Sequence, residues 1–139
     1  MQTLNLSGWI FYLSGKEDLL DRHKCGKWMY FFGNREFVEG ICRKAIKDGI
    51  VYECKHSDAD EGVACFYLNG DDIANHKRVI QFFLDNDLIR RTKTGKLYNI
   101  GFKYDDQTRA GEYGGDFTAE IKLEQFVDLN TGQWKIYGG

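Results

Sequence analysis

The chain has 139 residues, of which 42% are hydrophobic, 15% aromatic and 29% charged, a profile that can build one packed domain over residues 1–139 and excludes wholesale disorder. No run of about 18 apolar residues occurs, which excludes a membrane-spanning helix. The formal net charge of −2 excludes a globally basic surface of the kind that coats nucleic acid.

The sequence contains several short aromatic or β-branched runs and two longer amphipathic segments. In chain order, the pattern predicts a strand over 27–32, a helix over 34–49, strands over 50–57 and 62–70, a helix over 71–86, strands over 97–105 and 117–126, and a hairpin over 128–137. Asn34 can cap the first helix, and Gly49 supplies its left-handed stop. The second helix begins at Asp71 or Asp72.

Strands outnumber helices, and the two do not alternate strictly along the chain. This order favours an α+β fold, with a largely antiparallel sheet that carries the helices on one face. We expect the apolar helix residues to be buried beneath the sheet. These are Phe37, Ile41, Val79, Ile80 and Phe83.

The known catalytic and metal-binding signatures are absent from the sequence, including the phosphate-binding loops, the G-x-S-x-G elbow and the paired-histidine zinc motifs. We therefore expect no catalytic residue, no metal site and no cofactor. His76 falls on the apolar face of a helix and fits a satisfied core histidine better than a ligand. The four cysteines fit small buried hydrophobic residues. The N-terminus has no basic leader of the kind that precedes a secretory signal, and we expect a cytoplasmic protein with reduced cysteines.

Charge is distributed in blocks along the chain. Residues 22–55 have a balance of +4 and residues 77–103 a balance of +5, whereas residues 56–76 contain five acids and no Lys or Arg. A run of like charges can simply be a solvent-exposed surface that binds no ligand. Two basic blocks that bracket the middle strands can also converge on one patch, which is what a phosphorylated ligand requires.

Basic residues stand beside aromatic residues at three places. Lys27 precedes Trp28, Lys55 interrupts the strand IVYECKHS, and the segment GFKYDDQTRAGEYG contains Lys103 together with Thr108, Arg109 and Tyr113. Cations beside exposed rings suit a nucleotide, with its phosphates on Lys or Arg and its base stacked on a ring. The alternative is an aromatic core with lysine stems along it.

The order of these pieces resembles the family called domain of unknown function 1917, which is similar in fold to the cap-binding translation initiation factor 4E. The resemblance covers roughly residues 24–113. The matching positions are Lys27, Trp28, Lys55, Asp72, Arg78, Lys103, Asp105 or Asp106, Thr108, Gly111 and Tyr113. It implies a curved antiparallel sheet with two or three helices on its convex side and a concave face that bears Trp28, Lys55 and Lys103. Cap binding is not carried over, since no spacing identifies a pair of tryptophans that could sandwich a base.

These observations predict a binding module for a phosphorylated ligand, a nucleotide or an RNA end, which could sequester a nucleotide signal. Lys55, Arg78, Lys103 and Arg109 would neutralise phosphates, Trp28 or Tyr113 would stack on a base, and Thr108 completes the expected ligand-binding set. The two-residue period of a strand puts Lys55 and Lys103 on one face if Cys54 and Phe102 face the helices, with Glu53 as a counter-charge.

Two alternatives stay open. One is a protein-interaction domain that docks a partner through exposed aromatic residues. The other is an enzyme acting on a phosphorylated substrate, with Lys55 or Lys103 as base and Tyr104 or His56 as acid.

Overall fold

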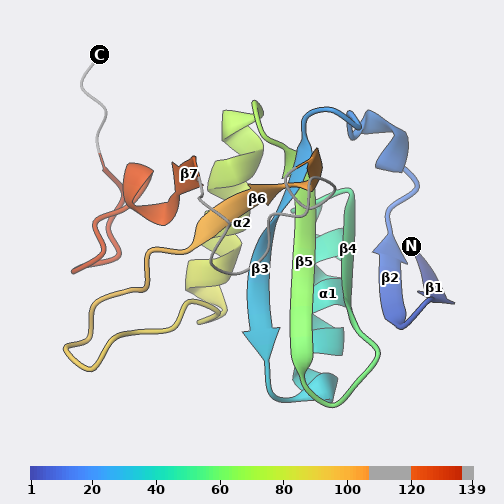
Figure 1. Ribbon diagram of the computed structural model, residues 1–139, viewed down its shortest axis with the longest axis horizontal. Helices are drawn as coiled ribbons and strands as arrows, with labels where there is room; N and C mark the ends of the chain where they lie inside the picture. The colour runs from blue at the N-terminus through green and yellow to red at the C-terminus, as the bar shows by residue number, and fades with distance from the viewer. Residues whose placement is uncertain (107–119, 136–139) are drawn as a thin grey trace.

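The structure is a computed structural model that describes residues 1–106 and 120–135. Its described part contains one seven-stranded sheet in the order β1-β2-β4-β5-β3-β6-β7, and every pairing is antiparallel (Figure 1). The strands are β1 (Gln2–Leu6), β2 (Trp9–Leu13), β3 (Cys25–Phe32), β4 (Glu53–Ser57), β5 (Gly62–Asn69), β6 (Gly101–Tyr104) and β7 (Ile121–Lys122). The predicted α+β class with a mostly antiparallel sheet is confirmed.

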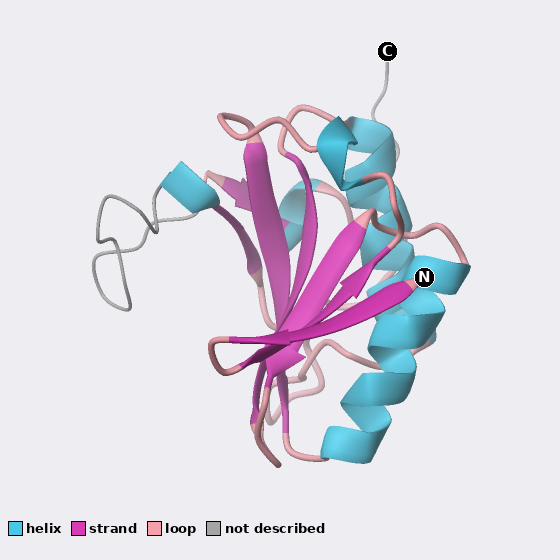
Figure 2. Cartoon of the chain, turned by 90° about the vertical axis from the view of Figure 1, so that its right-hand side faces the viewer, coloured by secondary structure: helices cyan, strands magenta, loops and turns pink. Residues whose placement is uncertain are grey.

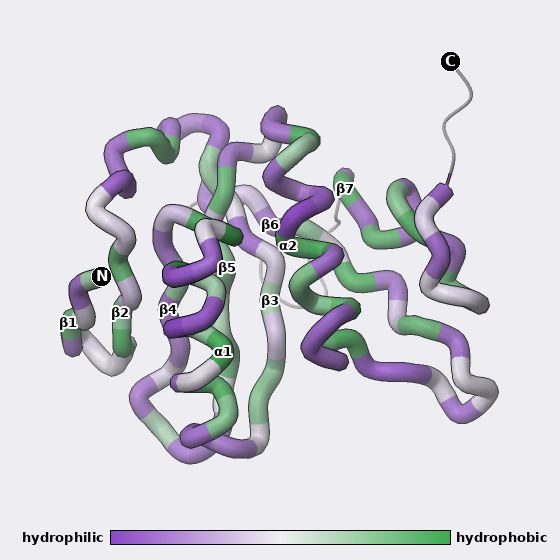
Figure 3. The backbone as a smooth tube through the Cα atoms, turned by 180° about the vertical axis from the view of Figure 1, so that it is seen from behind, coloured by the Kyte–Doolittle hydropathy of each residue, from purple (hydrophilic) through white to green (hydrophobic). Residues whose placement is uncertain are grey.

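Two α-helices, α1 (Arg35–Lys47) and α2 (Ile73–Asp85), lie on the same face of the twisted sheet (Figure 2). Their ends follow the expected chemistry. The Asn34 side chain accepts a hydrogen bond from the N–H of Phe37, and Asp72 does the same for Asn75. Gly49 follows α1 with a φ of 68°, as a left-handed stop requires. Figure 3 views both helices from their outer side, where hydrophilic and hydrophobic residues alternate along each.

The N-terminal hairpin of β1 and β2 was not predicted. Ser7 and Gly8 connect the two strands, and both have positive φ values, of 54° and 85°. Positive φ at both central residues is the geometry of a tight two-residue hairpin turn, whose twist matches that of the flanking strands. The hairpin extends the sheet through the pairing of β2 with β4.

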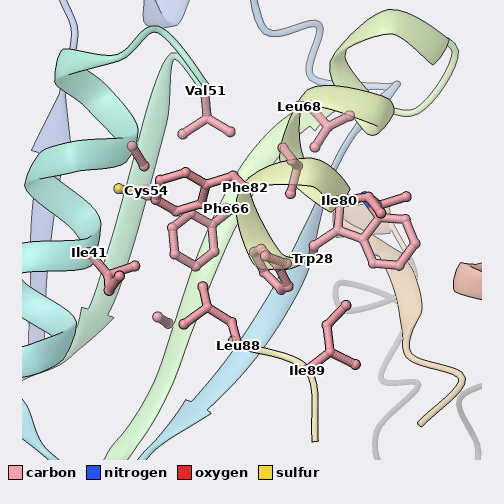
Figure 4. Close-up of a cluster of buried hydrophobic side chains, with 14 of the residues drawn as sticks. Trp28, Ile41, Val51, Cys54, Phe66, Leu68, Ile80, Phe82, Leu88 and Ile89 are labelled. Atoms are coloured by element: carbon pink, nitrogen blue, oxygen red, sulfur yellow. The ribbon is translucent and has the colours of Figure 1, made fainter. Parts of the chain in front are cut away.

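The core lies between the sheet and the helices (Figure 4). Trp28, Cys54, Phe66, Leu68 and Phe102 reach it from the sheet, and Ile41, Val79, Ile80 and Phe83 reach it from the helices. Burial of the four expected helix residues is therefore confirmed. The predicted burial of Phe37 is wrong, because this residue lies near the start of α1 with 45% of its surface exposed.

The C-terminal part of the chain has less strand than its pattern predicts. The expected strand over 97–105 is reduced to the four residues of β6. The expected strand over 117–126 is partly outside the described residues, and its described part has only β7 before the chain turns into the 3-10 helix η3 (Leu123–Gln125). The hairpin over 128–137 ends outside the described residues, and its described part has a single bridge, between Val127 and Trp134.

Candidate functional site: the lysine face of the sheet

Three lysines from three strands project from the face of the sheet opposite the helices. The register pairs Lys27 of β3 with Lys103 of β6 on one side and with Tyr67 of β5 on the other. Lys55 of β4 pairs with Cys65 of β5. Neighbouring residues on paired strands share a face, so these lysines lie together on one side of the sheet. We call this side the lysine face.

The lysine face is opposite the core because side chains alternate along each strand. Cys54 and Phe102, which adjoin Lys55 and Lys103 in sequence, are both buried in the core beneath the helices. The expectation that Lys55 and Lys103 share the helix-free side is therefore met by the register. Lys27 joins them there.

Lys55 is held by aromatic rings. Its Nζ lies 3.9 Å from the centroid of the Trp9 ring, 5.5 Å from that of Phe11 and 5.8 Å from that of Tyr67. Distances of up to about 6 Å allow a cation–π attraction. Lys55 is only partly exposed, and burial lowers the pKa of its ammonium group, as does the charge of Lys27.

Lys27 and Lys103 are nearly enclosed, with 8% and 7% of their surfaces exposed. The Lys27 Nζ forms a salt bridge of 3.0 Å with Oδ1 of Asp105, and it lies 5.9 Å from the centroid of the Tyr67 ring. Like charges directly opposite each other on paired strands destabilise a sheet. Asp105 therefore supplies a counter-charge at the point where Lys27 faces Lys103.

Glu53 is the second carboxylate on the lysine face, as the two-residue period predicts. It pairs with Tyr67 in the register. Burial raises the pKa of Glu53, and the charge of Glu17 raises it further, whereas Lys55 lowers it. The structure gives Glu53 no salt bridge among the described residues, so it does not neutralise Lys55 by direct contact.

The cysteine and tyrosine side chains of this face do not supply a nucleophile. Burial raises the pKa of the Cys65 thiol to about 11 and that of Cys25 to about 12. The pKa of Tyr67 is also raised by burial. All three groups therefore stay protonated at neutral pH, and thiols in this form react poorly.

The structure does not place Trp28 on the face where the predicted ligand site requires it. Its side chain points into the core, is fully buried, and donates a hydrogen bond from Nε1 to Nδ1 of His76. It cannot stack on a ligand at the lysine face, because the sheet lies between them. Trp9 and Phe11 of β2 are partly exposed rings on that face, and the exposed ring of Phe31 lies on the same side of β3 as Lys27.

Arg78, predicted to bind phosphate, is also away from the lysine face. It is exposed on α2, on the helix-bearing side of the sheet, and so lies on the opposite side from Lys55 and Lys103. Thr108, Arg109 and Tyr113 lie outside the described residues.

The proposed acids of the enzyme alternative are also on the wrong face. His56 is fully buried on the core side, where its Nε2 lies 2.9 Å from the hydroxyl of Tyr12. Tyr104 shares that side, with its ring 5.1 Å from that of Phe102 between centroids. Neither can donate a proton to a substrate held by Lys55 or Lys103.

Trp9 and Phe11 are the site residues that sequence reasoning missed. Their signal was present in the aromatic and β-branched run WIFYL and in the Ser-Gly pair before it, a dipeptide that marks a turn. Recognising that hairpin would have provided rings on the lysine face without recourse to Trp28.

The described residues contain no cluster of His, Cys, Asp or Glu that could hold a metal ion. Within the same part of the chain, neither helix is long and apolar enough to cross a membrane. All four cysteines are buried and free.

Comparison with known proteins leaves the family open. No protein-family model matches the sequence, and no curated protein matches it. The similarity to domain of unknown function 1917 and to initiation factor 4E therefore remains a prediction.

Proposed function

We propose that the protein is a binding module for a phosphorylated ligand, a nucleotide or an RNA end, and that the lysine face is its binding surface. The observation that carries the proposal is the state of Lys55. Its ammonium group is partly buried and lies among three rings, and it forms no salt bridge with any carboxylate of the described residues. A desolvated cation of this kind gains most from an anion that approaches it.

The charge balance of the face supports an anionic ligand. Lys27, Lys55 and Lys103 contribute three positive charges, and the described carboxylates on this face are Glu53 and Asp105. Asp105 is engaged with Lys27, and burial disfavours the charged form of Glu53. A phosphate with its two negative charges would relieve the repulsion that Lys27 exerts on Lys55.

The aromatic rings of β2 would bind the nucleobase of the ligand. Trp9 and Phe11 are partly exposed, and Lys55 occupies the face of Trp9 with its ammonium group at 3.9 Å. A phosphate that draws the ammonium away would free that ring face for a nucleobase. Stacking of a base on an aromatic ring contributes about 1–3 kcal/mol, in addition to the phosphate contact.

Calorimetric titration tests this proposal with three probes: ATP, an RNA tetranucleotide with a 5′-phosphate, and the same tetranucleotide without it. We expect a phosphorylated probe to bind and its affinity to fall as salt rises, since each phosphate contact releases counterions. Tighter binding of ATP would indicate a nucleotide ligand. Tighter binding of the 5′-phosphorylated RNA, and not of its unphosphorylated form, would indicate an RNA end.

The variant Lys55→Met/Lys103→Met keeps the aliphatic stems and removes two charges. We expect it to fold and to lose at least about tenfold in affinity, the effect of removing a charge-assisted contact. Lys77→Met/Arg78→Met is the matched control, because it removes two exposed charges from α2 on the other face. Equal losses in both variants, or no binding of any phosphorylated probe to the parent protein, would contradict the proposal. Should the double variant fail to fold, Lys55→Met alone makes the same comparison.

A further inference from the structure

The outer edge of β3 is only partly used by the sheet. On its inner edge β3 pairs with β5 along its whole length, from Cys25 opposite Asn69 to Phe32 opposite Gly62. On its outer edge only Gly26 and Lys27 pair with β6. The end of β3 that carries the arrowhead, from Tyr30 to Phe32, therefore extends past β6 and pairs with no described strand on its outer edge (Figure 1).

The chain that precedes β6 turns away from β3 and leaves this edge without a partner strand among the described residues. The N–H of Ile100 donates to the carbonyl of Tyr98 at 3.0 Å, and the N–H of Tyr98 donates to the carbonyl of Arg90 at 2.9 Å. These bonds direct the backbone of residues 98–100 toward itself and toward Arg90. β6 consequently begins at Gly101, which lies opposite Met29 when the register is extended, and no residue of β6 lies opposite Tyr30, Phe31 or Phe32.

Beyond Lys27 the outer edge of β3 pairs with no described strand, and one of its carbonyls is engaged by a side chain. Nη2 of Arg90 donates to the carbonyl of Phe31 over 3.4 Å, so the backbone of Phe31 is directed toward the outer edge. Because this direction alternates along an antiparallel strand, the N–H and C=O of Met29 point the same way. A row of such groups is a template for another strand.

An apolar groove runs beside this edge. Its volume is about 320 Å³, and its walls are formed by Met29, Tyr30 and Phe31 on one side and by Leu88, Tyr98 and Ile100 on the other. Phe31 and Tyr98 are 57% and 49% exposed. The groove therefore offers a surface for apolar side chains directly beside the backbone groups of Met29 and Phe31.

The rim of the groove is basic. Arg90 and Arg91 are exposed and lie beside Phe31, where Asp87 is the one acidic residue among the described residues that line the same hollow. Arg90 lines the groove itself. A ligand that pairs with β3 would therefore meet positive charge at one end, and a carboxylate is the complementary group.

We propose that the outer edge of β3, from Met29 to Phe32, binds an extended segment of a partner protein in which apolar and acidic residues alternate. The segment adds a strand in the position that a longer β6 would occupy, with its apolar side chains in the groove and a carboxylate on Arg90. This is strand addition, in which backbone bonds supply affinity and the pockets beside them supply specificity. The groove adjoins the lysine face, because Met29 and Phe31 alternate onto the same side of β3 as Lys27, but the proposal does not depend on the function proposed for that face.

The test uses two blocked peptides, (Val-Glu)₄ and (Val-Lys)₄, with amide hydrogen exchange and chemical shifts followed by NMR. In the free protein we expect the amides of Met29 and Phe31 to exchange faster than those of Trp28 and Tyr30, which face β5. We expect (Val-Glu)₄ to slow exchange at Met29 and Phe31 at least about tenfold, as formation of a strand pair requires, and (Val-Lys)₄ to have no such effect.

Two variants locate the contact. Met29→Pro removes the outward N–H at an edge position, where proline is tolerated, and Arg90→Glu reverses the charge at the rim. Each should weaken binding of (Val-Glu)₄ by at least about tenfold, the effect of losing a hydrogen bond to a charged or backbone group. Lys77→Glu, exposed on α2, is the matched control and should leave binding unchanged. Arg90→Glu alone decides the matter if the proline variant does not fold.

Several outcomes would overturn the proposal. One is slow exchange of the Met29 amide in the free protein, because the edge would then already be covered. If that protection grows with protein concentration, the occupant is a second copy of the chain. Equal binding of the two peptides, or binding of neither, would also overturn it. Protection of the same amides by an RNA tetranucleotide in place of (Val-Glu)₄ would assign the edge to nucleic acid instead.

Discussion

Trp28 and His76 are joined across the core by a hydrogen bond of 3.0 Å from the indole Nε1 to Nδ1 of the imidazole. The indole nitrogen can only donate, so Nδ1 of His76 must accept, and its Nε2 carries the proton. That Nε2 lies 2.8 Å from the carbonyl of Gly70 and donates to it. Both ring nitrogens are thus satisfied in the neutral form, within a fully buried side chain.

This arrangement predicts a loss of stability on acidification. Burial lowers the pKa of His76 below its usual value of 6.5, so below about pH 6.5 the unfolded chain binds a proton that the folded chain resists. The stabilisation that neutral His76 gives to the folded protein is fully present above that pH and is lost as the pH falls toward the lowered pKa. Urea unfolding at pH 7.5 and pH 5.5 measures the difference in the free energy of unfolding.

The variant Trp28→Phe/His76→Leu is the control for this measurement. It replaces both partners with apolar side chains, so no buried polar group is left without a partner. We expect its free energy of unfolding to fall less between the two pH values than that of the parent protein. An equal fall in both proteins would show that His76 does not cause the acid sensitivity.

Gly26 allows β3 and β6 to approach closely, and we expect Gly26→Ala to destabilise the protein by about 1–3 kcal/mol. A Cβ at this position would lie 2.6 Å from both the carbonyl oxygen of Lys103 and the ring of Phe102. The oxygen belongs to the paired backbone and can move only if β6 moves. Chemical unfolding measures the effect.

Gly40→Ala is the matched substitution and should act in the opposite direction. Gly40 lies within α1, and a Cβ there meets no atom within 4 Å. Alanine is favoured over glycine in a helix interior by about 0.5–1 kcal/mol. A destabilised Gly40→Ala protein, or an unaffected Gly26→Ala protein, would contradict these two assignments.

Phe83 and Phe37 test how far each helix contributes to the core. Phe83 is 1% exposed and lies with its ring centroid 5.2 Å from that of Phe66, so Phe83→Ala should cost about 3–5 kcal/mol. Phe37 is largely exposed, and Phe37→Ala should cost less than about 1 kcal/mol. Comparable losses in the two variants would mean that Phe37 is buried in solution.

The sequence was sufficient to predict those elements whose signals lie within one short segment of the chain. Asn34 as a cap, Asp71 or Asp72 as the start of the second helix, and the 3.6-residue period predicted both helices, because capping and amphipathicity are read within one segment. The two-residue period likewise predicted that Lys55, Lys103 and Glu53 share a face. These conclusions require only the alternation of side chains along one strand at a time.

The features that the sequence did not predict depend on contacts between distant segments. Lys27 and Trp28 are adjacent, so only one of them can face the ligand side, and the strand itself does not decide which. Trp28 is directed inward because a buried indole needs an acceptor, which His76 provides from α2. The pairing of β3 with β6 is equally non-local, and with it the unpaired edge of β3.

The order of strands in the sheet has a consequence for how the chain folds. β3 lies between β5 and β6, which are made later, and Trp9 of β2 pairs with Ser57 of β4. β3 has no partner strand, and β2 has only β1, until those residues have been synthesised, and closing such long loops is entropically costly. We therefore expect refolding on the scale of about milliseconds to seconds that is typical of non-local β pairing, with the ladder of β3, β5 and β4 formed before the two ends of the sheet are added.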